Sequence, residues 1–95
     1  MREYHEARDA ENALLAEVGR IGRLRSSAGC RCAFLLADVV AKRVRPSSKS
    51  VRIALDEFEG FTAEFDRVSA QLVAASQKRR ELAQLNFDAV FKGVP

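Results

Sequence analysis

Apolar residues recur every three or four residues along the second half of the chain. The heptad series that starts at Val51 has apolar side chains at ten of its twelve a and d positions, and its polar exceptions are Arg79 and Asn86. Such a repeat predicts a long amphipathic helix over about 51–92 that packs against other helices. Gly60 is its weak point, because glycine costs about 1 kcal/mol relative to alanine inside a helix.

The first half of the chain carries the same repeat with more interruptions. With Leu14 at a d position, nine of twelve a and d positions are compatible with burial, but glycines and serines accumulate between residues 19 and 29. These residues have low helix propensity. The pattern favours one helix over about 2–44 with a weak or kinked centre. The alternative is a pair of helices over about 2–20 and 30–44.

The two arms meet at a short segment, 45–50, that contains Pro46 and three serines. Proline disfavours the helical conformation of the preceding residue, and serine favours turns and helix N-caps. We expect Ser50 to cap the second helix, with Ser47 or Ser48 as alternatives. The predicted fold class is therefore all-α, and the whole chain forms a single-domain antiparallel helical hairpin that resembles a coiled coil.

Polar residues interrupt the apolar seam of each arm, and folding the chain at this turn predicts which of them face each other. Folding the chain at residue 47 pairs residue i with about residue 94 − i, which places Arg25 within a turn of Asp66 and Glu11 within a turn of Arg79. Each pair joins opposite charges across the hairpin. Buried polar residues at such positions can set register and partner number at a cost in stability. The sequence therefore predicts two ion pairs between the arms.

A lone two-helix hairpin cannot cover its own apolar stripe, because each stripe is about 100° wide and one partner helix covers only part of it. We expect the hairpin to associate, either with itself as a bundle or with other helical proteins. The alternative is a monomeric three-helix bundle that covers its own stripe. The residues expected to form the core or the interface are Leu14, Val18, Ile21, Leu35, Val39, Phe58, Phe61, Phe65, Val68, Leu72, Leu82, Leu85 and Phe91.

Basic residues are concentrated between residues 18 and 52, which hold nine bases and one acid in a chain of net charge +3. The main interpretation is complementarity between helices, with basic 20–31 facing acidic 56–66. The alternative is a basic tip that binds phosphates. This tip has neither aromatic residues for base stacking nor an exposed apolar anchor for lipid. Its residues are Lys42, Arg43, Arg45, Lys49 and Arg52.

Residues that could support catalysis or metal binding are few. His5 is the only histidine, and we expect it to be solvent-exposed on the first helix. Cys30 and Cys32 point about 200° apart on a helix, so we expect two free thiols in a reducing compartment. An intermolecular disulfide through the exposed thiol is the alternative. We expect no enzymatic activity, no cofactor and no metal, since a metal site needs further soft ligands nearby.

The chain has no apolar run long enough for a membrane span, and its first residues lack the apolar core of a signal peptide. The sequence thus predicts a non-catalytic helical protein–protein interaction module in the cytoplasm. Such a module would be a small structural or adaptor subunit of an intracellular assembly, or a homodimeric bundle. The alternative function is a nucleic-acid-associated helical subunit that uses the basic turn 42–52.

Overall fold

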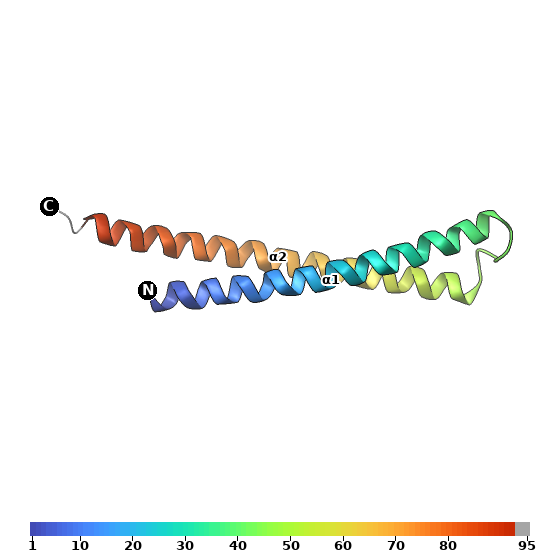
Figure 1. The fold of residues 1–95 in the computed structure, drawn as a ribbon, viewed down its shortest axis with the longest axis horizontal. Helices are drawn as coiled ribbons and strands as arrows, with labels where there is room; N and C mark the ends of the chain where they lie inside the picture. The colour runs from blue at the N-terminus through green and yellow to red at the C-terminus, as the bar shows by residue number, and fades with distance from the viewer. Residues whose placement is uncertain (93–95) are drawn as a thin grey trace. The chain divides into compact units, whose positions relative to one another are not determined.

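Two helices make up the part of the chain that the computed structural model describes, residues 1–92. Helix α1 covers Arg2–Val40 and helix α2 covers Lys49–Lys92 (Figure 1). The predicted all-α helical hairpin is confirmed, and the first arm is one continuous helix. Most helical stability in proteins comes from the packing of an apolar face, which outweighs the low propensity of the central glycines and serines of α1.

Contacts within the chain fall into two units. The terminal unit contains Met1–Val18 and Val68–Pro95, and the connecting unit contains Gly19–Arg67. In each unit, one segment of α1 runs antiparallel to one segment of α2.

Buried apolar side chains form a core within each unit. The core of the connecting unit contains Ile21, Ala28, Cys32, Val51 and Ala54, and that of the terminal unit contains Ala7 and Val68. Every one of these residues lies at an a or d position of the two heptad series. The repeat therefore identified the inward faces of both helices correctly.

Helix α1 ends at Val40, earlier than the expected end near residue 44. Lys42 adopts a left-handed backbone conformation, with a φ of 61°. Its amide donates to the carbonyl of Val39 at 3.0 Å, and the amide of Arg43 donates to the carbonyl of Asp38 at 2.8 Å. This is the Schellman arrangement, which ends a helix by satisfying its last carbonyls and which most often uses glycine at the left-handed residue.

The connection between the helices covers residues 41–48, and it is longer than the expected turn 45–50. Pro46 does lie in a turn, which is closed by a 3.0 Å hydrogen bond from the amide of Ser48 to the carbonyl of Arg45. Proline at the second position of a turn is favoured because its φ is already set.

Ser48, and not Ser50, caps the N-terminus of α2. Its Oγ accepts a hydrogen bond from the amide of Val51 at 3.4 Å, which satisfies one of the free donors of the first turn. Ser50 is itself part of the first turn of α2. The preferred sequence prediction was therefore wrong by two residues, because several serines in a row offer equivalent hydroxyls.

The register between the helices is shifted from the predicted one by about one heptad, or seven residues, because α1 ends earlier than expected. The predicted pair of Arg25 with Asp66 was wrong, since Arg25 Nε donates to Thr62 Oγ1 at 3.1 Å. The predicted pair of Glu11 with Arg79 is confirmed, with Arg79 Nε 2.8 Å from Glu11 Oε1.

Candidate protein-interaction surface

The predicted core and interface residues differ in how far the hairpin covers them. Ile21 and Val68 are buried, whereas Leu85 is 63% exposed and Phe91 is 60% exposed. The half-buried ones are Leu14, Val18, Leu35, Val39, Phe58, Phe61, Phe65, Leu72 and Leu82. Most of the predicted set thus faces the partner helix of the same chain, and Leu85 and Phe91 do not.

In the connecting unit, two phenylalanines of α2 pack where α1 has glycines. A Cβ atom at Gly22 would lie 3.4 Å from Cε2 of Phe65, and a Cβ at Gly29 would lie 3.2 Å from Cε2 of Phe58. The two glycines are seven residues apart, and so are the two phenylalanines. The same glycine–phenylalanine contact therefore occurs twice, one heptad apart. The glycines that weaken α1 as an isolated helix therefore let α2 approach it closely.

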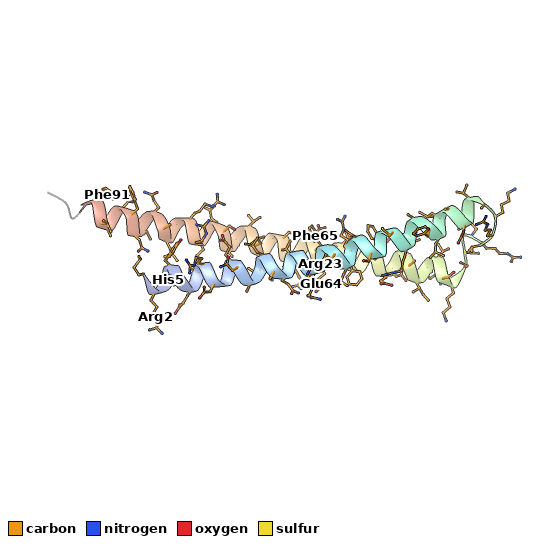
Figure 2. The ribbon with its side chains drawn as sticks, in the orientation of Figure 1. Arg2, His5, Arg23, Glu64, Phe65 and Phe91 are labelled. Carbon is orange, nitrogen blue, oxygen red and sulfur yellow. The ribbon has the colours of Figure 1, made fainter. Side chains whose placement is uncertain are left out.

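Arg25 lies between these two contacts. Its guanidinium carbon is 5.5 Å from the ring centroid of Phe58 and 5.4 Å from that of Phe65, which is labelled in Figure 2. Cations are attracted to the faces of aromatic rings at this distance. With its hydrogen bond to Thr62, the arginine has a polar partner as well as two rings at a seam position that offers no carboxylate. The rings around Arg25 were not predicted from the sequence.

In the terminal unit, Glu11 and Arg79 form a largely buried ion pair. One Arg79 N–H is shared between the two carboxylate oxygens, at 2.8 and 3.0 Å. A hydrogen bond from Ser76 lowers the pKa of the Glu11 carboxyl, and the hydrogen bond and charge of Arg79 lower it further. The same pairing, helped by Tyr4, raises the pKa of Arg79. Both groups are therefore held in their charged forms.

The last turns of α2 carry an exposed apolar cluster, which we call the α2 terminal patch. It consists of Phe87, Val90 and Phe91, all more than half exposed (Phe91 is labelled in Figure 2), whereas the exposed Leu85 lies on another side of the helix. The rings of Phe87 and Phe91 have centroids 4.3 Å apart. Exposed apolar side chains that gather in one place, unlike scattered ones, mark interaction sites.

A second exposed surface, the α1 outer face, lies on the side of α1 away from its buried residues. Phe34 is 76% exposed there, and Val40 is 82% exposed. Sequence reasoning missed it because only the a and d positions were counted. The available signal was the lack of charge at outward positions that are normally polar. The α1 outer face consists of Ser26, Ser27, Cys30, Ala33, Phe34, Ala37, Val40 and Ala41, all exposed.

The predicted basic tip surrounds the connection, and its five cationic residues are all exposed. Within the described residues, the ion pair at this tip joins Arg43 Nη1 to Asp38 Oδ1 at 3.7 Å. The expectation that the tip lacks an exposed apolar side chain was wrong, because Val40 stands at the end of α1 beside it. Phosphate binding by the tip stays a prediction.

The two cysteines are free and differ in environment. Cys30 is exposed, whereas Cys32 is buried and its Sγ donates to the carbonyl of Ala54 at 3.2 Å. His5 is exposed and makes an edge-on contact with the ring of Tyr4. Across residues 1–92, no three His, Cys, Asp or Glu side chains gather closely enough to hold a metal ion.

Neither α1 nor α2, as far as the structure describes them, has a stretch long and apolar enough to cross a membrane. Comparison of the chain with protein-family models, with curated proteins and with solved structures finds no match.

Proposed function

We propose that this chain is a non-catalytic helical protein–protein interaction module, a small structural or adaptor subunit that binds helices of itself or of another protein. The observation that carries this proposal is the α2 terminal patch, where Phe87, Val90 and Phe91 stay more than half exposed. Full burial of one such side chain is worth about 1.5–3 kcal/mol. A partner that covers the patch would therefore gain substantial free energy.

The spacing within the patch fits recognition by another helix. Phe87, Val90 and Phe91 stand at positions i, i+3 and i+4, so they lie along one side of α2. Amphipathic helices bind one another through anchors at this spacing. The rings of Phe87 and Phe91 lie against each other and together offer a large apolar area for burial by a partner.

The test combines the mass in solution with the exposure of apolar surface. Light scattering over a wide concentration range is expected to show assembly beyond one 10.5 kDa chain. Changing Phe87 and Phe91 together to Gln should weaken this assembly while the helical circular dichroism stays unchanged, since neither ring is in a core. Leu15→Gln is the matched control, because Leu15 is exposed in the same unit but lies on α1.

A hydrophobic dye such as ANS supplies the second measurement, because it binds exposed apolar surface. If the partner is a different protein, the isolated chain should be monomeric and should bind the dye through the Phe87 and Phe91 rings. A chain that is a single copy at every concentration and binds no dye would overturn the proposal.

The basic tip supports a second candidate function, association with nucleic acid. Among the described residues, Lys42, Arg45, Lys49 and Arg52 are exposed and have no acidic partner within ion-pair distance. Exposed cations at one place can bind phosphates and release counterions. If the tip binds in this way, the protein should form complexes that contain RNA or DNA.

This candidate is tested by a salt titration of binding to generic RNA and duplex DNA. Each phosphate contact contributes about 0.9 to the slope of log affinity against log salt for duplex DNA. Changing Lys42, Arg45, Lys49 and Arg52 together to Ala should remove both the binding and the slope. Absence of binding at low salt would discard this function and leave the protein-interaction proposal untouched.

A further inference from the structure

The outer face of α1 lacks charge over a stretch in which an isolated hairpin would be expected to carry it. Its eight residues from Ser26 to Ala41 are exposed, and none of them is acidic or basic. In contrast, the outward residues of α2 include Asp56, Glu59 and Asp66. A helix is polar on its solvent side and apolar on the side that packs. By this rule α1 has two packing sides between residues 26 and 40, and the hairpin covers one of them.

The shape of the α1 outer face suits close contact with another helix. Its centre is made of small side chains, among them Cys30, Ala33 and Ala37, which let two helix backbones approach. The larger side chains of Phe34 and Val40 project beyond these small ones, and they are 76% and 82% exposed, respectively. The face extends over about four helical turns.

The charged residues along one edge of this face indicate which partner binds there. Arg31 and Asp38 are seven residues apart and therefore lie on the same edge, with Phe34 near the point midway between them. In an antiparallel pair related by a two-fold axis, the same edge of each helix meets across the contact. An axis beside Phe34 would place Arg31 of each copy opposite Asp38 of the other.

Both charged groups can accept this second partner. Arg31 contacts Glu57 within its own chain, and its side chain is still 52% exposed. Asp38 pairs with Arg43 at 3.7 Å, and its side chain is 39% exposed. A guanidinium group has five N–H donors and a carboxylate has about four acceptor sites, so each can serve two partners.

A parallel pair lacks this match. In that arrangement the edge with Arg31 and Asp38 would meet the opposite edge of the second copy, which carries the half-exposed Leu36. Arg31 and Asp38 would then face apolar surface of the second copy and would keep only the partners from their own chain, at a cost in desolvation. Charge complementarity therefore favours the antiparallel arrangement.

We infer that the α1 outer face binds the same face of a second copy of this chain, antiparallel, with Phe34 of both copies at the two-fold axis and two reciprocal Arg31–Asp38 pairs beside it. This inference rests on the proposed function and deepens it, because it names a second copy as one partner and the α1 outer face as a binding surface besides the α2 terminal patch. A contact of four turns is smaller than a standard protein interface. The dimer should therefore dissociate on dilution.

The first test compares two exposed alanines at equivalent outward positions. Ala37→Glu places a charge at the centre of the α1 outer face, so it should break the dimer through this face and lower the mass measured by light scattering. Ala63→Glu, on the outward side of α2, is the control and should leave the mass unchanged. Both variants should keep the helical circular dichroism, because neither alanine is buried.

The second test reverses the charges at the edge. Arg31→Glu and Asp38→Arg should each weaken the dimer by about tenfold, and the double variant should recover it, since the reciprocal pairs are rebuilt with opposite polarity. The pairs with Glu57 and Arg43 within the chain are lost in the double variant as well. Recovery therefore cannot come from them, and a double variant as weak as the singles would contradict the inference.

A cross-link distinguishes the two orientations. In the antiparallel dimer Cys30 lies opposite Val40 of the second copy, so Val40→Cys should form an intermolecular disulfide under mild oxidation. Changing Cys30 to Ser in that variant should abolish the cross-link. Efficient cross-linking of the unaltered chain through Cys30 would instead show the parallel arrangement and overturn the inference.

Failure of this inference and failure of the proposed function have different signatures. A mass that Ala37→Glu leaves unchanged, but that falls when Phe87 and Phe91 are changed, would place the contact on the α2 terminal patch alone. That result overturns the inference and supports the proposed function. A chain that is monomeric at every concentration but still binds ANS also overturns the inference and supports the proposed function. A monomeric chain that binds no dye overturns the inference and the proposed function.

Discussion

Glu11 accepts one shared N–H of Arg79 on both of its carboxylate oxygens, at 2.8 and 3.0 Å, and so joins α1 to α2 within the terminal unit. Each residue interrupts the apolar seam of its own helix. Together they form a pair whose side chains are 12% and 28% exposed, respectively. A polar break in one helix is therefore matched by the polar break in the other.

This pair predicts a pH dependence of stability. The pKa of Glu11 is lowered by Ser76 and Arg79 in the folded chain. The stabilisation should therefore be complete above the pKa of an unfolded glutamate, about 4.3, and should be lost as the pH falls below it through the lower folded pKa. Urea unfolding of Glu11→Gln should show lower stability than the unaltered chain at neutral pH, and the difference should shrink in acid. Glu6→Gln is the control at neutral pH and should change the stability little, because its partner Arg2 is 93% exposed.

The glycines of the helices are expected to respond differently to alanine. Gly60→Ala should raise the free energy of unfolding by about 1 kcal/mol, because an added Cβ meets nothing within 4 Å and glycine has low helix propensity. Gly29→Ala should raise the free energy of unfolding by less, since its Cβ would lie 3.2 Å from the Phe58 ring. Denaturant unfolding of the two variants checks the order, and an equal gain at both positions would mean that the ring contact is not tight.

Replacement of Arg25 should cost more than its partial exposure suggests. Arg25→Ala removes the hydrogen bond to Thr62 and the contacts with the Phe58 and Phe65 rings, for an expected loss of about 1–3 kcal/mol in the free energy of unfolding. Arg25→Lys should lose part of this, because an ammonium group cannot match the planar guanidinium. The exposed Arg23, labelled in Figure 2, is the control, with an expected effect within about 0.5 kcal/mol.

The end of α1 offers a stabilising substitution. Lys42 has a φ of 61°, a conformation that costs a non-glycine residue about 1 kcal/mol. Lys42→Gly should therefore raise the free energy of unfolding by about that amount. Arg43→Gly is the neighbouring control, because Arg43 does not have a positive φ and should gain nothing. Thermal unfolding of both variants makes the comparison.

Much of this hairpin could be predicted from the heptad pattern. The positions of Ile21, Ala28, Val51 and Val68 in the cores follow from it, because helix geometry repeats an inward face every seven residues whatever the partner. The exposed α1 outer face could also have been predicted from its missing charges. The polar match of Glu11 with Arg79 was predicted as well, since opposite charges at two breaks in the seam attract.

The register and the capping residue could not be predicted, and both were decided by tertiary contacts. A slip of seven residues keeps every a and d position facing inward, so hydrophobic burial hardly distinguishes one register from the next. The choice depends on shape: the Phe58 ring fits over Gly29, the Phe65 ring fits over Gly22, and Arg25 fits between the two rings. Such contacts exist only after both helices have met, and a one-dimensional pattern contains no information about which residues will face each other.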